Sequence, residues 1–217
     1  MFAVLVVFFC NIFMNITQAL NVFFFTYNLG NASLMSLFGI ISLASCVGFF
    51  IIPALARRFK KKHLLMTIVA ADIVVRIIWF SVGYSSVVVS FVFIAITMLL
   101  YTATGPLISS MLAETIEYTE YKTGKRNEAV TFSGQAFTGK LSVAIAGGLT
   151  GVILTWINYA PNQDQTVATM DALFFVVALL PALGSLIRLI VMHFYSYTED
   201  EYNDIVEKLD RRKREAV

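Results

Sequence analysis

Residues 2–27, FAVLVVFFCNIFMNITQALNVFFFTY, form a predominantly apolar run that contains no charged side chain. Its length exceeds the roughly 20 residues that an α-helix needs to cross about 30 Å of hydrocarbon. It is also too long for the apolar core of a signal peptide, which spans about 7–15 residues. The stretch therefore predicts a membrane-spanning helix.

Five further apolar runs are bounded by glycine, polar or charged residues. None alternates apolar and polar residues as transmembrane strands do, as the segment ADIVVRIIWF at 71–80 illustrates. Of the 217 residues, 58% are hydrophobic and 14% are charged, against about 45–50% and about 25% in soluble domains. We therefore expect an all-α membrane protein in which residues 1–195 form a bundle of six transmembrane helices, with spans at about 2–27, 34–56, 64–83, 87–109, 130–156 and 171–194.

Residues 196–217 predict an amphipathic helix outside the bundle. Thr198 and Glu201 have the spacing of a capping box. Apolar side chains recur at helical intervals beside a basic end: Tyr202, Ile205, Val206 and Leu209. A helix of this kind is expected to lie on the inner leaflet of the membrane.

The basic residues predict the orientation of the bundle. Thirteen of the sixteen lie in the segments 57–62, 122–126 and 208–214. The loops that would lie on the opposite side of the membrane contain no lysine or arginine. Because short cytoplasmic loops carry the excess of basic residues, we expect a multi-pass protein of the cell (inner) membrane with both termini in the cytoplasm.

The other three basic residues lie inside predicted spans, where a charge is costly and often functional. Arg76 follows Asp72 by four residues, a spacing that allows either a local ion pair or a pair that lines a substrate path. Arg188 is close enough to the cytoplasmic end for its side chain to reach the lipid headgroups. Lys140 has no acidic residue in its own span, so its compensation must come from elsewhere.

Polar side chains mark candidate binding faces on three predicted spans. Lys140 and Gln135 lie on different sides of the fifth helix. Asn15 and Gln18 belong to an amide-rich stripe of the first span, and such amides bind either sugar hydroxyls or neighbouring helices. Tyr101 lies on the fourth span near a break at Gly105 and Pro106. Gly147 and Gly151 on the side that carries Lys140 have a GxxxG spacing, which permits close helix packing, and the other residues on this side are Ser133, Phe137 and Ala144.

The sequence offers little support for catalysis, a metal site or nucleic-acid binding. It lacks HExxH, GxSxG, a P-loop and GxGxxG, and its two histidines lie in distant regions of the chain. Cys10 and Cys46 are isolated within apolar runs and are interpreted as small buried hydrophobes. The net charge of +2 is too small to indicate a nucleic-acid partner.

The segment MLAETIEYTEYKTGKRNEAVTFSGQAFTGK, residues 111–140, resembles the corresponding stretch of the glycoside-pentoside-hexuronide cation symporters. These proteins form the melibiose carrier group within the major facilitator superfamily. The resemblance covers nearly the whole chain, because it extends to FTYNLGNASLMSLF at 25–38, PALARRFKKKH at 53–63, NYAPNQDQT at 158–166 and YTEDEYNDIVEKLDRR at 197–212.

This resemblance implies uptake of a sugar or glycoside coupled to sodium or protons, by alternating access between two six-helix halves. The chain resembles the carboxyl-terminal half only, so the implied partner is a complementary amino-terminal half. The resemblance places Lys140 and Gln135 near the sugar and the ligands of the coupling cation on the missing half, with no other cofactor. It also implies an inner gate of charge contacts between the halves, formed here by Glu114, Glu117, Glu120 and Arg126.

Two other interpretations remain open at the sequence level. The chain could be a truncated remnant that inserts into the membrane without transporting, or a half-transporter that forms a homodimer. A membrane enzyme is disfavoured, because Asp72 is the only acidic residue well within a predicted span.

Overall fold

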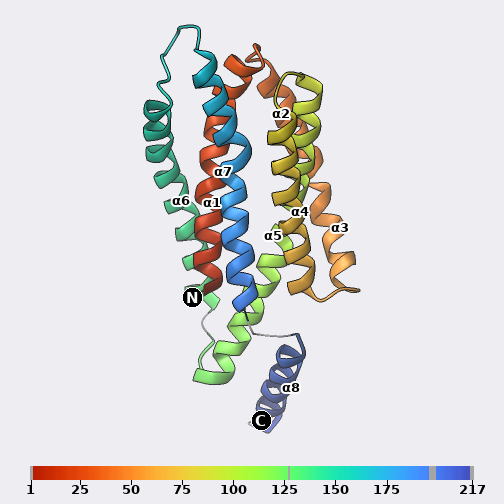
Figure 1. Cartoon of the computed structure of the whole chain (residues 1–217). Coiled ribbons are helices and arrows are strands. Elements are labelled where there is room, and N and C mark those ends of the chain that lie inside the picture. The colour runs from red at the N-terminus through yellow and green to blue at the C-terminus, as the bar shows by residue number, and fades with distance from the viewer. Residues whose placement is uncertain (1, 127, 196–198, 216–217) are drawn as a thin grey trace.

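A computed structural model describes residues 2–126, 128–195 and 199–215, and these residues form helices and connecting loops without a β-strand. Most helices stand roughly side by side in an upright bundle, and the last helix lies below it (Figure 1). The elements are α1 (Phe2–Phe23), the π-helical turn η1 (Phe24–Asn28), α2 (Leu34–Ser45), α3 (Val47–Ala56), α4 (Lys61–Val82), α5 (Val87–Thr123), α6 (Glu128–Trp156), α7 (Val167–Phe194) and α8 (Glu199–Glu215).

Five helical stretches of the described chain are long and apolar enough to cross a membrane. They comprise α2 with α3, and then α4, α5, α6 and α7 one by one. The prediction of an all-α membrane protein is therefore confirmed. The first predicted span, 2–27, corresponds to α1 with η1 and is not among these five, so the count of six stays a prediction.

The second predicted span is divided at Cys46 into α2 and α3. In a continuous α-helix the Phe49 amide would bond to the Ser45 carbonyl. It bonds instead to the Cys46 carbonyl at 3.0 Å, while the Ser45 carbonyl accepts the hydroxyl of Thr102 on α5 at 2.7 Å. A Cβ atom on Gly48 would lie 3.1 Å from that same hydroxyl, so the absence of a side chain there allows α5 to approach.

The fourth predicted span is longer than expected, because α5 continues through Pro106 to Thr123 instead of ending near residue 109. Proline removes one backbone hydrogen bond, but the extension beyond it contains no glycine or second proline before Gly124 and includes the good helix formers Met111, Leu112 and Ala113. Met111, Leu112 and Ile116 in this extension are buried, so packing also stabilises it. The helix ends at Gly124, which has φ +69° and donates its amide to the Glu120 carbonyl at 2.8 Å.

Helix α1 packs against α6 and α7, α4 packs against α5 and α7, and α5 packs against α2 and α3. The contact between α1 and α7 is close, since a Cβ atom on Gly184 would lie only 2.9 Å from the Phe13 ring. At one end of the bundle, aromatic rings from η1, α4 and α7 form a cluster that includes Phe24, Trp79 and Phe174. Helix α6 touches α1 extensively and α5 only slightly, so much of its surface is uncovered.

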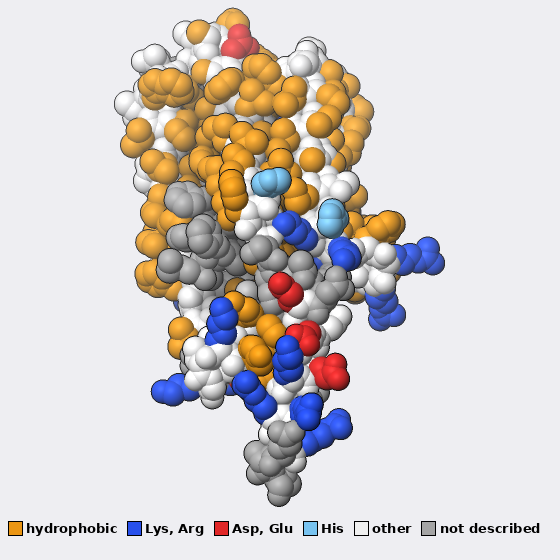
Figure 2. Space-filling view, turned by 60° about the horizontal axis from the view of Figure 1, so that its bottom comes forward, with side chains coloured by type: hydrophobic (Ala, Val, Ile, Leu, Met, Phe, Trp, Pro, Cys, Tyr) orange, Lys and Arg blue, Asp and Glu red, His pale blue; other side chains and the backbone are white. Residues whose placement is uncertain are grey.

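The charge asymmetry is visible on the surface. Lysine and arginine side chains gather at the end where α8 lies, whereas hydrophobic side chains cover the bundle above it (Figure 2). We call this the basic end; it includes the loop 57–60, the segment 122–126 and α8.

The positive-inside rule predicts that the basic end faces the cytoplasm. Thr123 at this end and Gln163 at the opposite end are both exposed. In a background without Cys10 and Cys46, Gln163→Cys in intact cells should react with a membrane-impermeant thiol reagent, and Thr123→Cys should react only after lysis. The reversed labelling pattern would contradict the predicted orientation.

Candidate functional site

The uncovered side of α6 carries Lys140. Its side chain is exposed, and among the described residues it forms no hydrogen bond or ion pair. Cβ atoms built on Gly147 and Gly151 would meet nothing within 4 Å, so the GxxxG spacing has no described helix packed on it. The residues that share this side with Lys140 are exposed as well: Ser133, Phe137, Ala144, Gly147 and Gly151. We call this surface the open face of α6.

The opposite strip of α6 packs on α1. Ser142 is fully buried, with its Oγ 2.7 Å from the Thr138 carbonyl and 3.2 Å from the Phe8 carbonyl. Gln135 is half-buried near this strip, so the structure does not place it on the side of Lys140.

The amide stripe of α1 has mixed surroundings. Asn21 is buried, Asn15 is half-buried and Gln18 is exposed. Tyr101 on α5 donates its hydroxyl to Asn11 at 3.3 Å, which links α5 to α1. The side-chain amides of Asn15, Gln18 and Gln135 have no hydrogen-bond partner among the described residues. These amides therefore keep donors and acceptors for water or a polyhydroxyl ligand.

Asp72 and Arg76 form a local ion pair on α4. Arg76 Nε lies 3.0 Å from both carboxylate oxygens of Asp72, and both residues are buried. Ser185 on α7 also donates its hydroxyl to Asp72 at 2.7 Å. The network therefore joins α4 to α7 and satisfies the carboxylate within the bundle. Sequence reasoning missed Ser185, because nothing in a sequence shows which serine of another helix faces an acid.

The expectation that Arg188 reaches the lipid headgroups is wrong. Arg188 is only 5% exposed, and its Nη1 donates to the Thr104 hydroxyl on α5 at 3.1 Å. Thr104 in turn lies 2.7 Å from the Tyr101 carbonyl. No acidic residue lies three or four positions from Arg188 on its own helix. The guanidinium instead stays inside the bundle because the Thr104 hydroxyl on the neighbouring helix accepts its hydrogen bond.

At the basic end, the structure brings the predicted gate acids together on the extension of α5. Glu114 is buried and pairs with Lys61 at the start of α4. Tyr202 on α8 also lies here, and Lys61 is 5.9 Å from the centre of its ring. Burial, followed by the neighbouring Glu117 side chain, raises the pKa of Tyr202 from 10.0 to about 12. Tyr202 was not predicted as a site residue.

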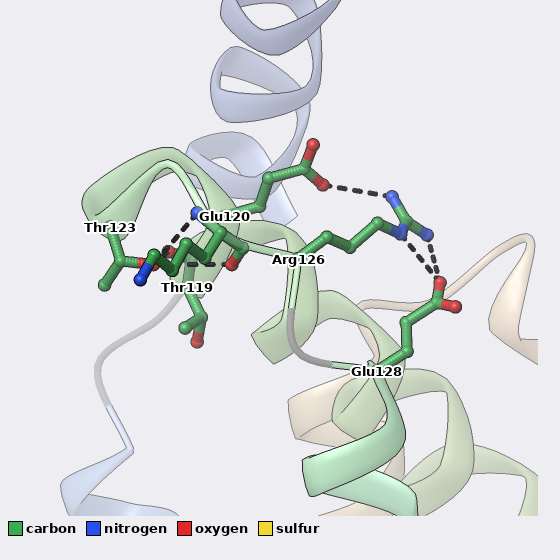
Figure 3. A network of polar contacts seen from close by, with 6 residues as sticks. Thr119, Glu120, Thr123, Arg126 and Glu128 are labelled. Atoms are coloured by element: carbon green, nitrogen blue, oxygen red, sulfur yellow. Dashed lines mark hydrogen bonds and ion pairs between the residues drawn. The ribbon is translucent and has the colours of Figure 1, made fainter.

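Arg126 bridges the end of α5 and the start of α6 (Figure 3). Its Nη1 lies 3.0 Å from Glu120, and its Nε lies 2.8 Å from Glu128. Glu128, and to a lesser extent Glu120, raises the pKa of the exposed Arg126 guanidinium. Glu114, Glu120 and Arg126 thus have ion-pair partners within this chain, and contacts of the predicted gate with another half stay a prediction.

Helix α8 packs on the extension of α5. Ile205 and Leu209 are buried, and Arg212 lies 4.7 Å from the ring centre of Tyr121, whose carbonyl it also contacts at 3.3 Å. The expectation that this apolar face binds the inner leaflet is therefore wrong for these two residues, because protein covers them. Thr198, half of the predicted capping box, lies outside the described residues.

Comparison with known proteins decides the family. The profile of the MFS/sugar transport protein family matches residues 1–199. The chain belongs to this family. It is 31% identical over 93% of its length to the putative 2,3-dihydroxypropane-1-sulfonate exporter of Escherichia coli (strain K12), and 30% identical over 94% to the putative sulfoquinovose importer of the same organism. It is also 29% identical over 87% to the isoprimeverose transporter of Lactiplantibacillus pentosus.

The family match confirms the resemblance to sugar symporters of the major facilitator superfamily. These relatives are named as an exporter, an importer and a transporter, so the comparison points to transport and not to catalysis. The chain covers only 44% of the first two and 40% of the third. It therefore spans less than half the length of these members of the MFS/sugar transport protein family.

The Asp72 network generates a prediction about stability. Removing one member of a buried ion pair leaves the other charge uncompensated, which costs about 3–5 kcal/mol. Asp72→Ala should lower the free energy of unfolding in detergent by this amount, whereas Ser185→Ala should cost only about 1 kcal/mol. Replacing both charges, as in Asp72→Leu with Arg76→Leu, should recover most of the loss. An Asp72→Ala protein as stable as wild type would contradict this assignment.

Proposed function

We propose that this chain acts as the carboxyl-terminal half of a secondary transporter that couples sugar or glycoside uptake to sodium or protons by alternating access. The observation that supports this proposal is the open face of α6. On this face, Lys140 is exposed within an apolar helix. The chain also spans less than half the length of the relatives compared above.

A charge at this depth requires compensation. Insertion scales put the cost of a lysine at the centre of a membrane helix at about 2.5–3.5 kcal/mol. Among the described residues no carboxylate neutralises Lys140, so its partner would be water, a substrate oxygen or an acid on another chain. Each requires that the open face of α6 border a polar cavity, and transporters built from two halves hold their substrate in such a cavity near the midplane.

The polar groups of this chain suit a sugar substrate. Lys140 supplies hydrogen-bond donors, and the amides of Asn15, Gln18 and Gln135 supply donors and acceptors that match hydroxyl groups. An ammonium also suits an acidic sugar, and relatives include a putative sulfoquinovose importer and a glucuronide carrier protein homolog. Tyr101 joins this set through its link to Asn11 on α1.

The coupling cation is proposed to bind on the complementary half. Within the described apolar spans, the carboxylate of Asp72 is already occupied by Arg76 and Ser185. No group of three or more His, Cys, Asp or Glu residues in the described chain could hold a metal ion. The basic end would then face the cytoplasm of the cell (inner) membrane, where Glu114, Glu117, Glu120 and Arg126 would serve as the gate.

Reconstitution tests this function. Proteoliposomes that contain this chain alone should show no sugar counterflow above empty vesicles, because one half supplies only half a site. Vesicles that contain it with a complementary amino-terminal half should show saturable counterflow. Robust counterflow by the chain alone would replace the proposal with a homodimer, and its absence from every pairing would favour a non-transporting remnant.

In the active pairing, Lys140→Ala should lower sugar affinity at least tenfold, equivalent to about 1.4 kcal/mol, with an unchanged melting temperature. Lys125→Ala is the matched control, since this lysine is exposed at the basic end and should leave sugar affinity unchanged. Isothermal titration beside a melting curve separates the two roles of Lys140. Normal affinity with lowered stability would make Lys140 a structural residue.

A further inference from the structure

Helix α3 leaves an apolar side exposed, and that side ends in a pair of arginines. Phe50 is 81% exposed, and Ala54 and Arg57, which are also exposed, follow it at intervals of four and three residues. These intervals place the three side chains on one side of the helix. The Phe59 amide bonds to the Leu55 carbonyl at 3.0 Å, so the helical turn continues past the end of α3. Along this side, about 10 Å of helix separate Phe50 from Arg57.

The two arginines, Arg57 and Arg58, are both exposed, and neither side chain forms a hydrogen bond or an ion pair with a described residue. The lysines that follow them differ in this respect. Lys61 pairs with an acid on α5, and Lys62 donates to a backbone carbonyl just beyond the end of α7. Because a guanidinium carries its donors in a fork that matches phosphate and carboxylate groups, the arginine pair forms a surface that suits an anion.

Phe59 adds an aromatic ring next to these arginines. It is 59% exposed in the turn between α3 and α4. A single exposed apolar side chain is common, but Phe59 lies one turn beyond Leu55, and Leu55, Ile51 and Phe50 are exposed as well. Figure 2 shows hydrophobic side chains next to Lys and Arg side chains at the rim of the bundle. We call the exposed residues of the segment 50–59 the basic strip of α3.

The basic strip ends at the depth where lipid headgroups are expected. It belongs to the stretch Leu34–Ala56, which is long and apolar enough to cross a membrane, and to the turn that follows. Figure 1 shows this turn at the end of the bundle, whereas the far end of α5, near which Lys122 and Lys125 lie, projects beyond the bundle. Cations that directly follow a membrane span reach lipid phosphates, and their attraction to the surface falls off within about 8–10 Å in physiological salt.

We propose that the basic strip of α3 binds an anionic phospholipid of the leaflet that the basic end faces, with the phosphate on Arg57 and Arg58 and an acyl chain along Phe50 and Ile51. Membrane lipids bind most strongly where apolar contact and attraction of basic side chains to anionic headgroups act together. A phospholipid is favoured over an acidic protein segment, because the cations stand at the end of a continuous apolar strip. All the residues involved belong to this chain, so the inference does not depend on the transport activity proposed above.

Tryptophan fluorescence measures which lipid lies beside the strip. Phe59→Trp introduces an indole, and the emission of the unchanged chain, which contains Trp79 and Trp156, is subtracted. The chain is reconstituted alone in vesicles of phosphatidylcholine and phosphatidylglycerol. Two samples have the same composition and differ only in which lipid carries bromine on its acyl chains, since bromine quenches the indole on contact. Per brominated molecule, phosphatidylglycerol should quench the introduced indole at least twofold more than phosphatidylcholine does.

Arg57→Gln with Arg58→Gln should abolish this difference and leave the melting temperature unchanged, because both side chains are exposed. Lys122→Gln with Lys125→Gln is the matched control, since it removes the same charge at the basic end but away from the strip, and it should keep the difference. Equal quenching by the two lipids in the Phe59→Trp chain would overturn the proposal, as would an equal loss in both double variants. Loss of the difference on adding soluble glycerol phosphate would also overturn it, because the strip would then bind soluble anions.

Discussion

A positive charge inside hydrocarbon must be compensated, and this constraint organises the bundle. Asp72 meets it for Arg76 on the same helix, with Ser185 on α7 bonded to that carboxylate, and Thr104 on α5 contributes to it for Arg188 on α7. Lys140 receives no such compensation from the described residues, because its helix contacts mainly α1 and turns the lysine away from that contact. Lys140 therefore differs from Arg76 and Arg188, and we propose that a component outside this chain compensates it.

The same logic applies at the basic end, where water lowers the cost of charge. On the extension of α5, Lys61 neutralises Glu114 and Arg126 neutralises Glu120. Solvent and salt share in the compensation of exposed charges, so the exposed pairs of Arg126 stabilise the fold less than the buried network of Asp72 does.

Hydropathy and charge predicted the all-α membrane class and the places of most helices, since both depend on composition along the chain. Local pairing was also predictable, because Asp72 and Arg76 are neighbours on one helix. Contacts between distant elements were not: the acceptor of Arg188 lies on another helix, and the division at Cys46 depends on a hydroxyl from α5. The packing of α8 on α5 was missed for the same reason, because an amphipathic pattern does not distinguish a helix that binds lipid from one that packs on protein.

The central claim is that the complementary half covers the open face of α6. A spin label at Ala144→Cys reports on this face, and one at the exposed Leu183→Cys on α7 serves as the lipid-facing control. On assembly, the account predicts that collisions with lipid-soluble oxygen fall at Ala144 while collisions with a water-soluble nickel complex rise, and that neither changes at Leu183. An assembled, transporting pair in which Ala144 stays as accessible to oxygen as Leu183 would contradict it.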